Sequence, residues 1–119
     1  VSEGLIPAPV MVQLCMGIPW GAPDDLNTFM AMVNNVPPEW IYSAFSIGRH
    51  QMPYVAAAVL SGGNVRVGLE DNLWLGKGRL ATNAELVEHA VTIIEAMGVR
   101  IMTPEEVRAE LQLTKRSMP

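Results

Sequence analysis

The segment GGNVRVGLEDN, residues 62–72, decides the fold of this chain. A glycine pair precedes an apolar run rich in valine, which predicts a buried strand over residues 65–69. Because side chains alternate between the two faces of a strand, every second residue from Val65 should point toward covering helices. Arg66 and Glu70 then lie on the opposite face, where the glycine between them leaves room for the arginine side chain.

Two more strands are indicated upstream of this segment. VMVQLCMG at residues 10–17 and WIYSAFSI at residues 40–47 are short apolar runs that end at or just before a glycine. Helical spacing and helix caps predict one helix after each strand and a fourth near the end of the chain. We expect these helices over residues 24–33, 53–61, 83–97 and 104–111.

Alternating strands and helices are typical of a parallel sheet covered by helices, and near-continuous apolar strands need cover on both faces. Three βα units do not close a barrel, which takes eight units and ~250 residues. Two α/β architectures therefore fit: a small open sheet, or the equivalent of three units of a (β/α)8 TIM barrel. No linker interrupts the chain, so residues 1–119 should belong to one domain without an internal boundary.

Two helix starts carry a capping box, in which a threonine and a glutamate three residues later satisfy each other's backbone N–H groups. They are TNAE at residues 82–85 and TPEE at residues 103–106. The second box opens a short helix whose Val107 and Leu111 should face inward. Residues 70–81, before the first box, are expected to form a long loop.

Composition excludes several classes of protein. Half of the 119 residues are hydrophobic and 17% are charged, against roughly a quarter charged in ordinary domains. The sequence contains no run of ~18 apolar residues, so no membrane-spanning helix is predicted. The net charge of −4 argues against nucleic-acid binding. The N-terminal stretch lacks the pattern of a signal peptide, so a cytoplasmic location is expected. A chain this small and this apolar should meet a partner surface or be part of something larger.

Cysteine and tryptophan give weaker signals. The single cysteine, Cys15, excludes an internal disulfide and is expected to be a small buried hydrophobe. Trp20, Trp40 and Trp74 are too dispersed to form a stacking platform, so we expect them to pack in the core or in a pocket wall.

Charged side chains gather at the carboxyl end of the third predicted strand. Arg66, Glu70 and Asp71 lie there, at the edge where ligands bind in α/β folds. Two interpretations stand: ordinary solvated loop charges, or a metal or acid–base site, because buried charges are costly unless they are paired or bound to metal. Zinc takes three protein ligands in a catalytic site, so two carboxylates do not suffice. His50 is a weaker candidate at the same edge, and His89 should be a solvent-facing helix residue.

Basic residues near the same edge are candidates for phosphate binding. Arg49 precedes a helix N-terminus, which favours anions. Lys77 and Arg79 lie after the third strand, and phosphate sites of barrels form after the last strands. The alternative is that all three are solvated loop charges.

Four motifs together resemble the C-terminal portion of the β-keto acid cleavage enzyme family, which includes 3-keto-5-aminohexanoate cleavage enzymes. They are GRHQMP (48–53), GGNVRVGLEDN (62–72), GRLATNAELV (78–87) and TPEEVRAELQL (103–113). The resemblance extends over nearly the whole chain. Asn64 departs from it, because the family often has histidine there.

The resemblance implies a metal-dependent enzyme that condenses a β-keto acid with acetyl-CoA and gives acetoacetate and a new CoA ester. It also implies a homotetrameric TIM barrel, of which this chain would supply the last three βα units. Glu70 would be a ligand of one divalent metal ion, typically zinc. Asp71 would be the catalytic base, and Arg66 would support it. The phosphates of acetyl-CoA would lie near Arg49, Lys77 and Arg79.

The resemblance also defines the main alternative. The family's His-x-His metal ligands come from an early strand, and this chain has no such pair. Alone, it should neither bind zinc tightly nor catalyse. The alternative is therefore a catalytically silent fragment, or a split-barrel subunit that acts by assembly with a chain carrying the early strands. A receiver-type domain fits poorly, because no acidic cluster follows the first strand.

Overall fold

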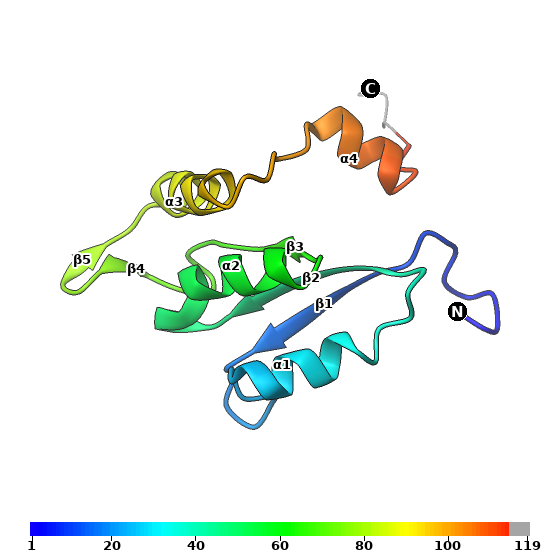
Figure 1. Cartoon of the computed structure of the whole chain (residues 1–119), viewed down its shortest axis with the longest axis horizontal. Helices are drawn as coiled ribbons and strands as arrows, with labels where there is room; N and C mark the ends of the chain where they lie inside the picture. Colours follow the sequence, from blue (N-terminus) through cyan, green and yellow to red (C-terminus); the bar gives the residue numbers. More distant parts are fainter. Residues whose placement is uncertain (115–119) are drawn as a thin grey trace.

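Three parallel strands form the centre of this computed structural model, which describes residues 1–114 (Figure 1). Their order in the sheet is β1–β2–β3, with bounds Met11–Met16, Ile41–Ser46 and Asn64–Val65. The register pairs Met11 with Ile41 and continues to the end of both strands. The parallel α/β sheet predicted from the sequence is confirmed, and it is compatible with part of a TIM barrel.

Helices follow each strand as the sequence predicts. A single 3-10 turn, η1 (Gly48–His50), leads into the second of them. Among residues 1–114, none of the helices is both long and apolar enough to cross a membrane. The helices are α1 (Leu26–Val33), α2 (Gln51–Leu60), α3 (Asn83–Ala96) and α4 (Pro104–Glu110).

The main core lies between the sheet and the first two helices. Phe29 of α1 is 1% exposed, and its ring meets that of Tyr54 from α2 edge to face, with centroids 5.3 Å apart. Burial raises the pKa of Tyr54 to about 12. The remaining members come from the strands and α2: Leu14, Met16, Ala44 and Ala58. α1 and α2 therefore cover one face of the sheet, and the opposite face carries both polar and apolar side chains, such as Gln13 and Phe45.

The third strand is shorter than the predicted 65–69, because β3 pairs with β2 over only two residues. Side chains from two helices then supply the backbone partners. Gln51 Nε2 donates to the Gly68 carbonyl at 3.0 Å, and Leu69 N–H donates to Asn83 Oδ1 at 2.9 Å. Each backbone group needs a hydrogen-bond partner, and a side chain can serve as well as a neighbouring strand. Because Gln51 and Asn83 supply such partners here, the chain can leave the sheet early.

Residues 70–81 contain a hairpin instead of the predicted uninterrupted loop. β4 (Trp74–Gly76) pairs antiparallel with β5 (Arg79–Leu80). A two-residue turn joins them, and Gly78 adopts a φ of +76° there. Positive φ is typical of two-residue hairpin turns, and glycine adopts it without steric cost. The sequence lacked alternating flanks long enough to reveal so short a hairpin.

Both predicted capping boxes are present at the starts of α3 and α4. α3 packs on α2 through Val55, Ala90 and Ile94. α4 buries no residue. The prediction that Val107 faces inward is wrong, because its side chain is 37% exposed. Leu111, predicted to face inward as well, is half-buried. Both line a hollow at the strand starts instead, because α4 touches that edge and not the main core.

The capping box of α4 makes a pH prediction. Hydrogen bonds from Arg100 and from the backbone of Thr103 lower the pKa of Glu106 from 4.5 to about 2. A lowered native pKa stabilises the fold above pH 4.5, and the contribution is lost as the pH falls toward about 2. The Tm of Glu106→Gln should therefore fall less steeply over this range than that of the unaltered protein. Glu110→Gln, on the same helix, is the control and should follow the unaltered protein; equal slopes for all three proteins would contradict the prediction.

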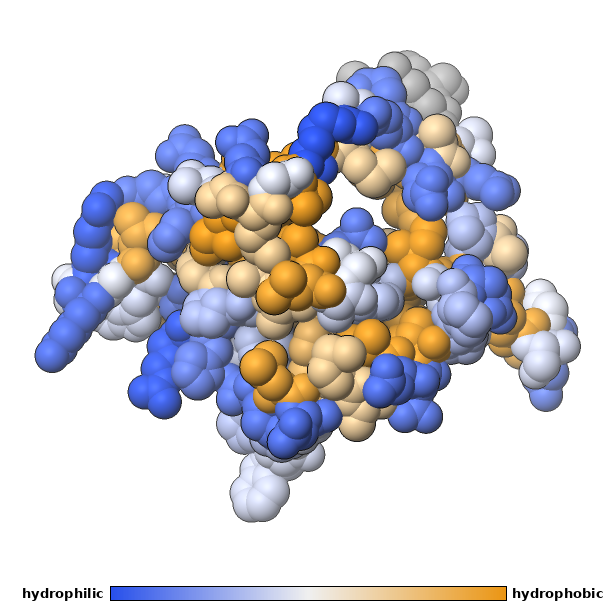
Figure 2. Space-filling model, viewed as in Figure 1, coloured by the Kyte–Doolittle hydropathy of each residue, from blue (hydrophilic) through white to orange (hydrophobic). Residues whose placement is uncertain are grey.

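Large hydrophobic side chains remain exposed over the molecule, and Figure 2 shows many of them on the face in view. Trp20 is fully exposed, contrary to the prediction of core or pocket-wall packing, because it sits in a tight turn that Gly21 N–H closes on the Ile18 carbonyl at 3.0 Å. Leu26 and Leu60, on the two sheet-covering helices, are 63% and 81% exposed. This apolar surface fits the expectation that the chain meets a partner surface.

Candidate functional site

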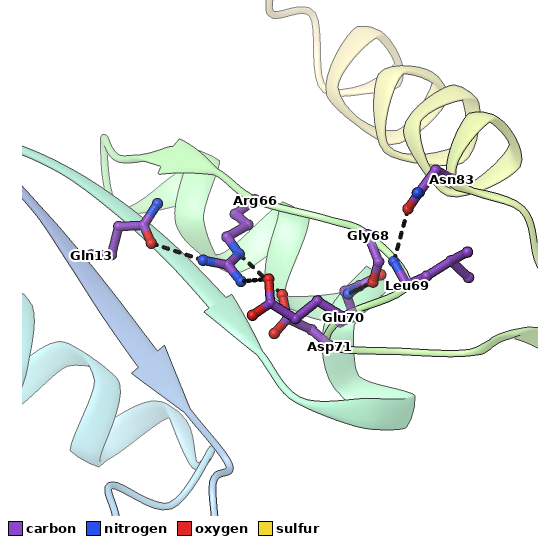
Figure 3. A network of polar contacts seen from close by, with 8 residues as sticks. Gln13, Arg66, Gly68, Leu69, Glu70, Asp71 and Asn83 are labelled. Atoms are coloured by element: carbon purple, nitrogen blue, oxygen red, sulfur yellow. Dashed lines mark hydrogen bonds and ion pairs between the residues drawn. The ribbon is translucent and has the colours of Figure 1, made fainter.

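Arg66 is the centre of a polar network on the uncovered face of the sheet (Figure 3). Its Nε–H donates to Asp71 Oδ2 at 3.1 Å, and its Nη2 donates to Glu70 Oε2 at 2.7 Å. Its Nη1 donates to Gln13 Oε1 of β1 at 3.1 Å. The guanidinium carbon lies 4.5 Å from the centroid of the Phe45 ring. The structure thus brings the three predicted site residues of this segment together.

Burial separates the two carboxylates of the network. The Asp71 side chain is 5% exposed, whereas that of Glu70 is 82% exposed. A buried carboxylate is costly without a partner, and the Arg66 guanidinium supplies the opposite charge. The interpretation as solvated loop charge therefore fits Glu70 but not Asp71.

Backbone hydrogen bonds hold Asp71 at the carboxyl edge of the sheet. Gly48 N–H, just after β2, donates to the Asp71 carbonyl at 2.6 Å. The N–H groups of Asp71 and Asn72 both donate to the Gly68 carbonyl at 3.2 Å. The Asn72 side chain is buried and bonds the backbone of Trp74 at both its N–H and its carbonyl. The backbone of Asp71 is thus tied to the end of β2, and the neighbouring Asn72 ties it to the hairpin.

The charges of Asp71 and Arg66 also act on the thiol of Cys15 in β1. Its side chain is half-buried, less than the sequence led us to expect. Burial raises the pKa of the Cys15 thiol, the negative charge of Asp71 raises it further, and Arg66 opposes both. Cys15 therefore ionises less readily than a free cysteine, and the charge of Asp71 contributes to this.

His50 is engaged away from this network. Its Nδ1 pairs with Asp24 Oδ2, which also accepts a hydrogen bond from Ser46 Oγ at 2.9 Å. The hydrogen bond with His50, and then that with Ser46, lowers the pKa of Asp24. These contacts join the N-terminal ends of α1 and α2, so the structure gives His50 a role in holding the two helix starts.

Two of the three predicted phosphate-binding residues lie around one cavity. Arg49 and Lys77 line it, and His89, exposed as predicted, completes its rim. Arg79 Nη2 donates instead to Glu85 Oε1 at 2.6 Å, outside the lining. The structure therefore joins Arg49 with Lys77 and does not place Arg79 with them.

The side chains able to bind a metal ion within residues 1–114 do not form a complete metal site. Residues 1–114 contain no group of three or more histidine, cysteine, aspartate or glutamate side chains able to hold an ion. Glu70 offers one carboxylate, whose Oε1 has no hydrogen bond within these residues. A zinc ion would need its other ligands from outside this set.

A parallel α/β sheet with an arginine-held, buried carboxylate at its carboxyl edge has the arrangement of an α/β enzyme site. The chain belongs to the beta-keto acid cleavage enzyme family, whose sequence pattern matches residues 1–113. The family expected from the four motifs is confirmed.

Curated relatives match almost all of this chain. It is 75% identical over 115 residues to a 3-dehydrocarnitine:acetyl-CoA trimethylamine transferase of Rhizobium meliloti, covering 97% of this chain and 38% of that protein. It is 37% identical to a 3-keto-5-aminohexanoate cleavage enzyme of Fusobacterium nucleatum, covering 96% and 42%. It is 36% identical to a 3,5-dioxohexanoate:acetyl-CoA acetone transferase of Paraburkholderia graminis, covering 95% and 38%. The chain thus spans about two-fifths of the length of these relatives.

Sequence reasoning missed several polar residues that position the site. Gln13 comes from β1, 53 positions before Arg66 in the chain, and Gln51 and Asn83 come from helix starts. Alternation along residues 10–17 does place Gln13 among apolar neighbours, and a lone polar residue in such a run was the available signal. For Gln51 and Asn83 no local pattern distinguishes them from exposed amides.

Proposed function

We propose that the protein carrying this chain exchanges acyl groups between a β-keto acid and acetyl-CoA, giving acetoacetate and a new CoA ester by a Claisen and retro-Claisen exchange. The observation that carries this proposal is the buried Asp71 carboxylate, held by Arg66 at the ligand-binding edge of the sheet. Family membership and the acetyl-CoA named for two relatives support it. Because the Rhizobium protein is 75% identical, 3-dehydrocarnitine is the first β-keto acid to assay.

In this proposal Asp71 is the general base. Arg66 occupies its Oδ2, so Oδ1 is left to accept a proton from the substrate. An arginine side chain stays charged at working pH, so Arg66 orients the carboxylate and stabilises negative charge but moves no proton. Glu70, exposed beside them, would be one ligand of a divalent ion such as zinc. When bound, such an ion would polarise the substrate's keto oxygens.

The remainder of a (β/α)8 barrel would provide the missing ligands and cover the exposed apolar surface. We propose that this chain forms the last three βα units of such a barrel, within one domain. The homotetramer, which the family resemblance implies, and the cytoplasmic location stay predictions. A silent fragment or split-barrel subunit that acts by assembly is the second candidate, favoured by the incomplete set of metal donors within residues 1–114.

Glu70→Ala tests the metal assignment. In the complete purified protein that carries this chain, this change should abolish acetoacetate formation and lower bound zinc from about one ion per subunit to a small fraction, because the site would lose one of about three protein ligands. Metal analysis and an acetoacetate assay on the same sample measure both. Glu88→Ala, an exposed carboxylate on α3, is the control and should change neither. Full zinc content in Glu70→Ala would overturn the ligand assignment.

A further inference from the structure

Gln13 of β1 is the one neutral side chain that hydrogen-bonds the Arg66 guanidinium within residues 1–114. Its Oε1 accepts from Arg66 Nη1 at 3.1 Å, across 53 positions of the chain. The register of the three strands places Gln13 level with Asn64, so Arg66 lies two residues nearer the carboxyl edge. Figure 3 shows Gln13 on one side of the guanidinium and the carboxylates of Glu70 and Asp71 on the other.

The two carboxylates share one edge of the guanidinium. Nε and Nη2 form the edge that ordinarily binds both oxygens of a single carboxylate. Here Nε–H donates to Asp71 and Nη2 donates to Glu70, so the edge is divided between them. Asp71 Oδ1 accepts no hydrogen bond within residues 1–114. The divided edge thus leaves free the oxygen that the proposed general base uses.

The contacts of Arg66 restrain different motions of the guanidinium. The Phe45 ring, 4.5 Å from the guanidinium carbon, fixes the plane of the group but allows rotation within that plane. Glu70 restrains this rotation weakly, because its side chain is 82% exposed and water competes for it. Asp71 can be bound through one oxygen or through two. The rotation is therefore set by Gln13, whose Oε1 holds the corner opposite the divided edge.

We propose that Gln13 is a positioning residue of this site: by holding Nη1 it keeps Arg66 divided between the two carboxylates, and Asp71 Oδ1 stays free for the substrate proton. Without this acceptor the guanidinium would turn in its plane and bind both oxygens of Asp71, since a two-point contact with a buried carboxylate is stronger than a one-point contact. An amide suits the role because it accepts a hydrogen bond without adding a third negative charge around Arg66. The inference rests on the proposed function for the role of Oδ1, but not for the contact itself.

The test compares variants of the complete protein that carries this chain, with 3-dehydrocarnitine and acetyl-CoA as substrates. Gln13→Met keeps the length of the side chain but removes the acceptor, so kcat should fall about tenfold, the equivalent of one hydrogen bond to a charged group. The KM for each substrate should stay within about twofold, because no substrate contact is removed. Gln13→Glu keeps an acceptor oxygen at the same reach and should keep kcat within about threefold of the unaltered protein.

Ser43→Ala is the matched control. Ser43 lies opposite Gln13 on β2, and its buried Oγ has no hydrogen-bond partner within residues 1–114. Its removal should therefore leave kcat unchanged.

Thermal unfolding gives a second readout that does not depend on turnover. The loss of Tm in Gln13→Met/Arg66→Met should be smaller than the sum of the losses in the two single variants, because each single change already removes the same contact.

The inference and the proposed function fail in different ways. A kcat for Gln13→Met close to that of the unaltered protein overturns the positioning role, and so does a Gln13→Glu variant as slow as Gln13→Met. Additive losses of Tm overturn the contact. If the losses of Tm are coupled but the unaltered protein forms no acetoacetate from any β-keto acid, the proposed function fails together with the role of Oδ1, while the contact between Gln13 and Arg66 stands.

Discussion

Asp71→Asn should lower kcat for acyl exchange by about a hundredfold to ten-thousandfold, the range that a positioned general base contributes. Asparagine keeps the shape of the side chain, and its amide oxygen still accepts the hydrogen bond that Arg66 Nε–H now makes at 3.1 Å. The bound metal should stay in place, because Glu70 is untouched. Steady-state kinetics with 3-dehydrocarnitine and acetyl-CoA, together with metal analysis, give the measurement. A kcat within fivefold of the unaltered protein would exclude Asp71 as the base.

The thiol of Cys15 gives the same variant a second readout that does not depend on turnover. The charge of Asp71 is the second cause, after burial, that raises the pKa of this thiol. Removing the charge should lower the pKa, so alkylation of Cys15 by iodoacetamide near about pH 8 should become faster. Glu95→Gln, an exposed carboxylate on α3, should not change the alkylation rate. If Asp71→Asn also leaves the rate unchanged, the carboxylate does not act on Cys15 as the structure indicates.

Arg66→Met should lower the free energy of unfolding by about 3 kcal/mol, the lower part of the range for breaking a buried ion pair from one side. The loss arises because the Asp71 side chain, only 5% exposed, would lose its charged partner. We expect a value at the low end of the range because the Arg66 side chain is 31% exposed and water partly screens its charge. Methionine preserves much of the packing on the Phe45 ring. Denaturant unfolding of the variant and the unaltered protein measures the difference.

A double variant separates the lost charge from lost packing. In Arg66→Met/Asp71→Asn no uncompensated charge remains buried, so most of the stability should return, while kcat for acyl exchange should stay at least about a hundredfold lower because the base is missing. Arg108→Met removes an exposed arginine whose ion pair with Glu105 spans 3.5 Å, and it should cost less than about 1 kcal/mol. No recovery in the double variant would mean that Arg66 stabilises the fold through packing and not through Asp71.

Local signals in the sequence predicted most of the elements. Apolar runs closed by glycine located β1 and β2, because strands of parallel sheets typically have near-continuous hydrophobic sequences. The capping boxes at Thr82 and Thr103 located the starts of α3 and α4, since a cap is complete within four residues. The early end of β3 was not predictable in this way, because it depends on amide side chains from α2 and α3 that no local pattern relates to Gly68 and Leu69.

The sequence by itself determined the family, the α/β class and the presence of Arg66, Glu70 and Asp71 at one strand end, because these depend on residue types at short, fixed spacing. Only the tertiary structure decided which carboxylate is buried, since burial depends on neighbours from distant parts of the chain such as Gly48, whose N–H donates to the Asp71 carbonyl. It also decided that Arg49 and Lys77 share a cavity with Trp74 and that Arg79 does not. A cavity is formed by elements that meet only after folding, and neither charge nor spacing along the chain specifies it.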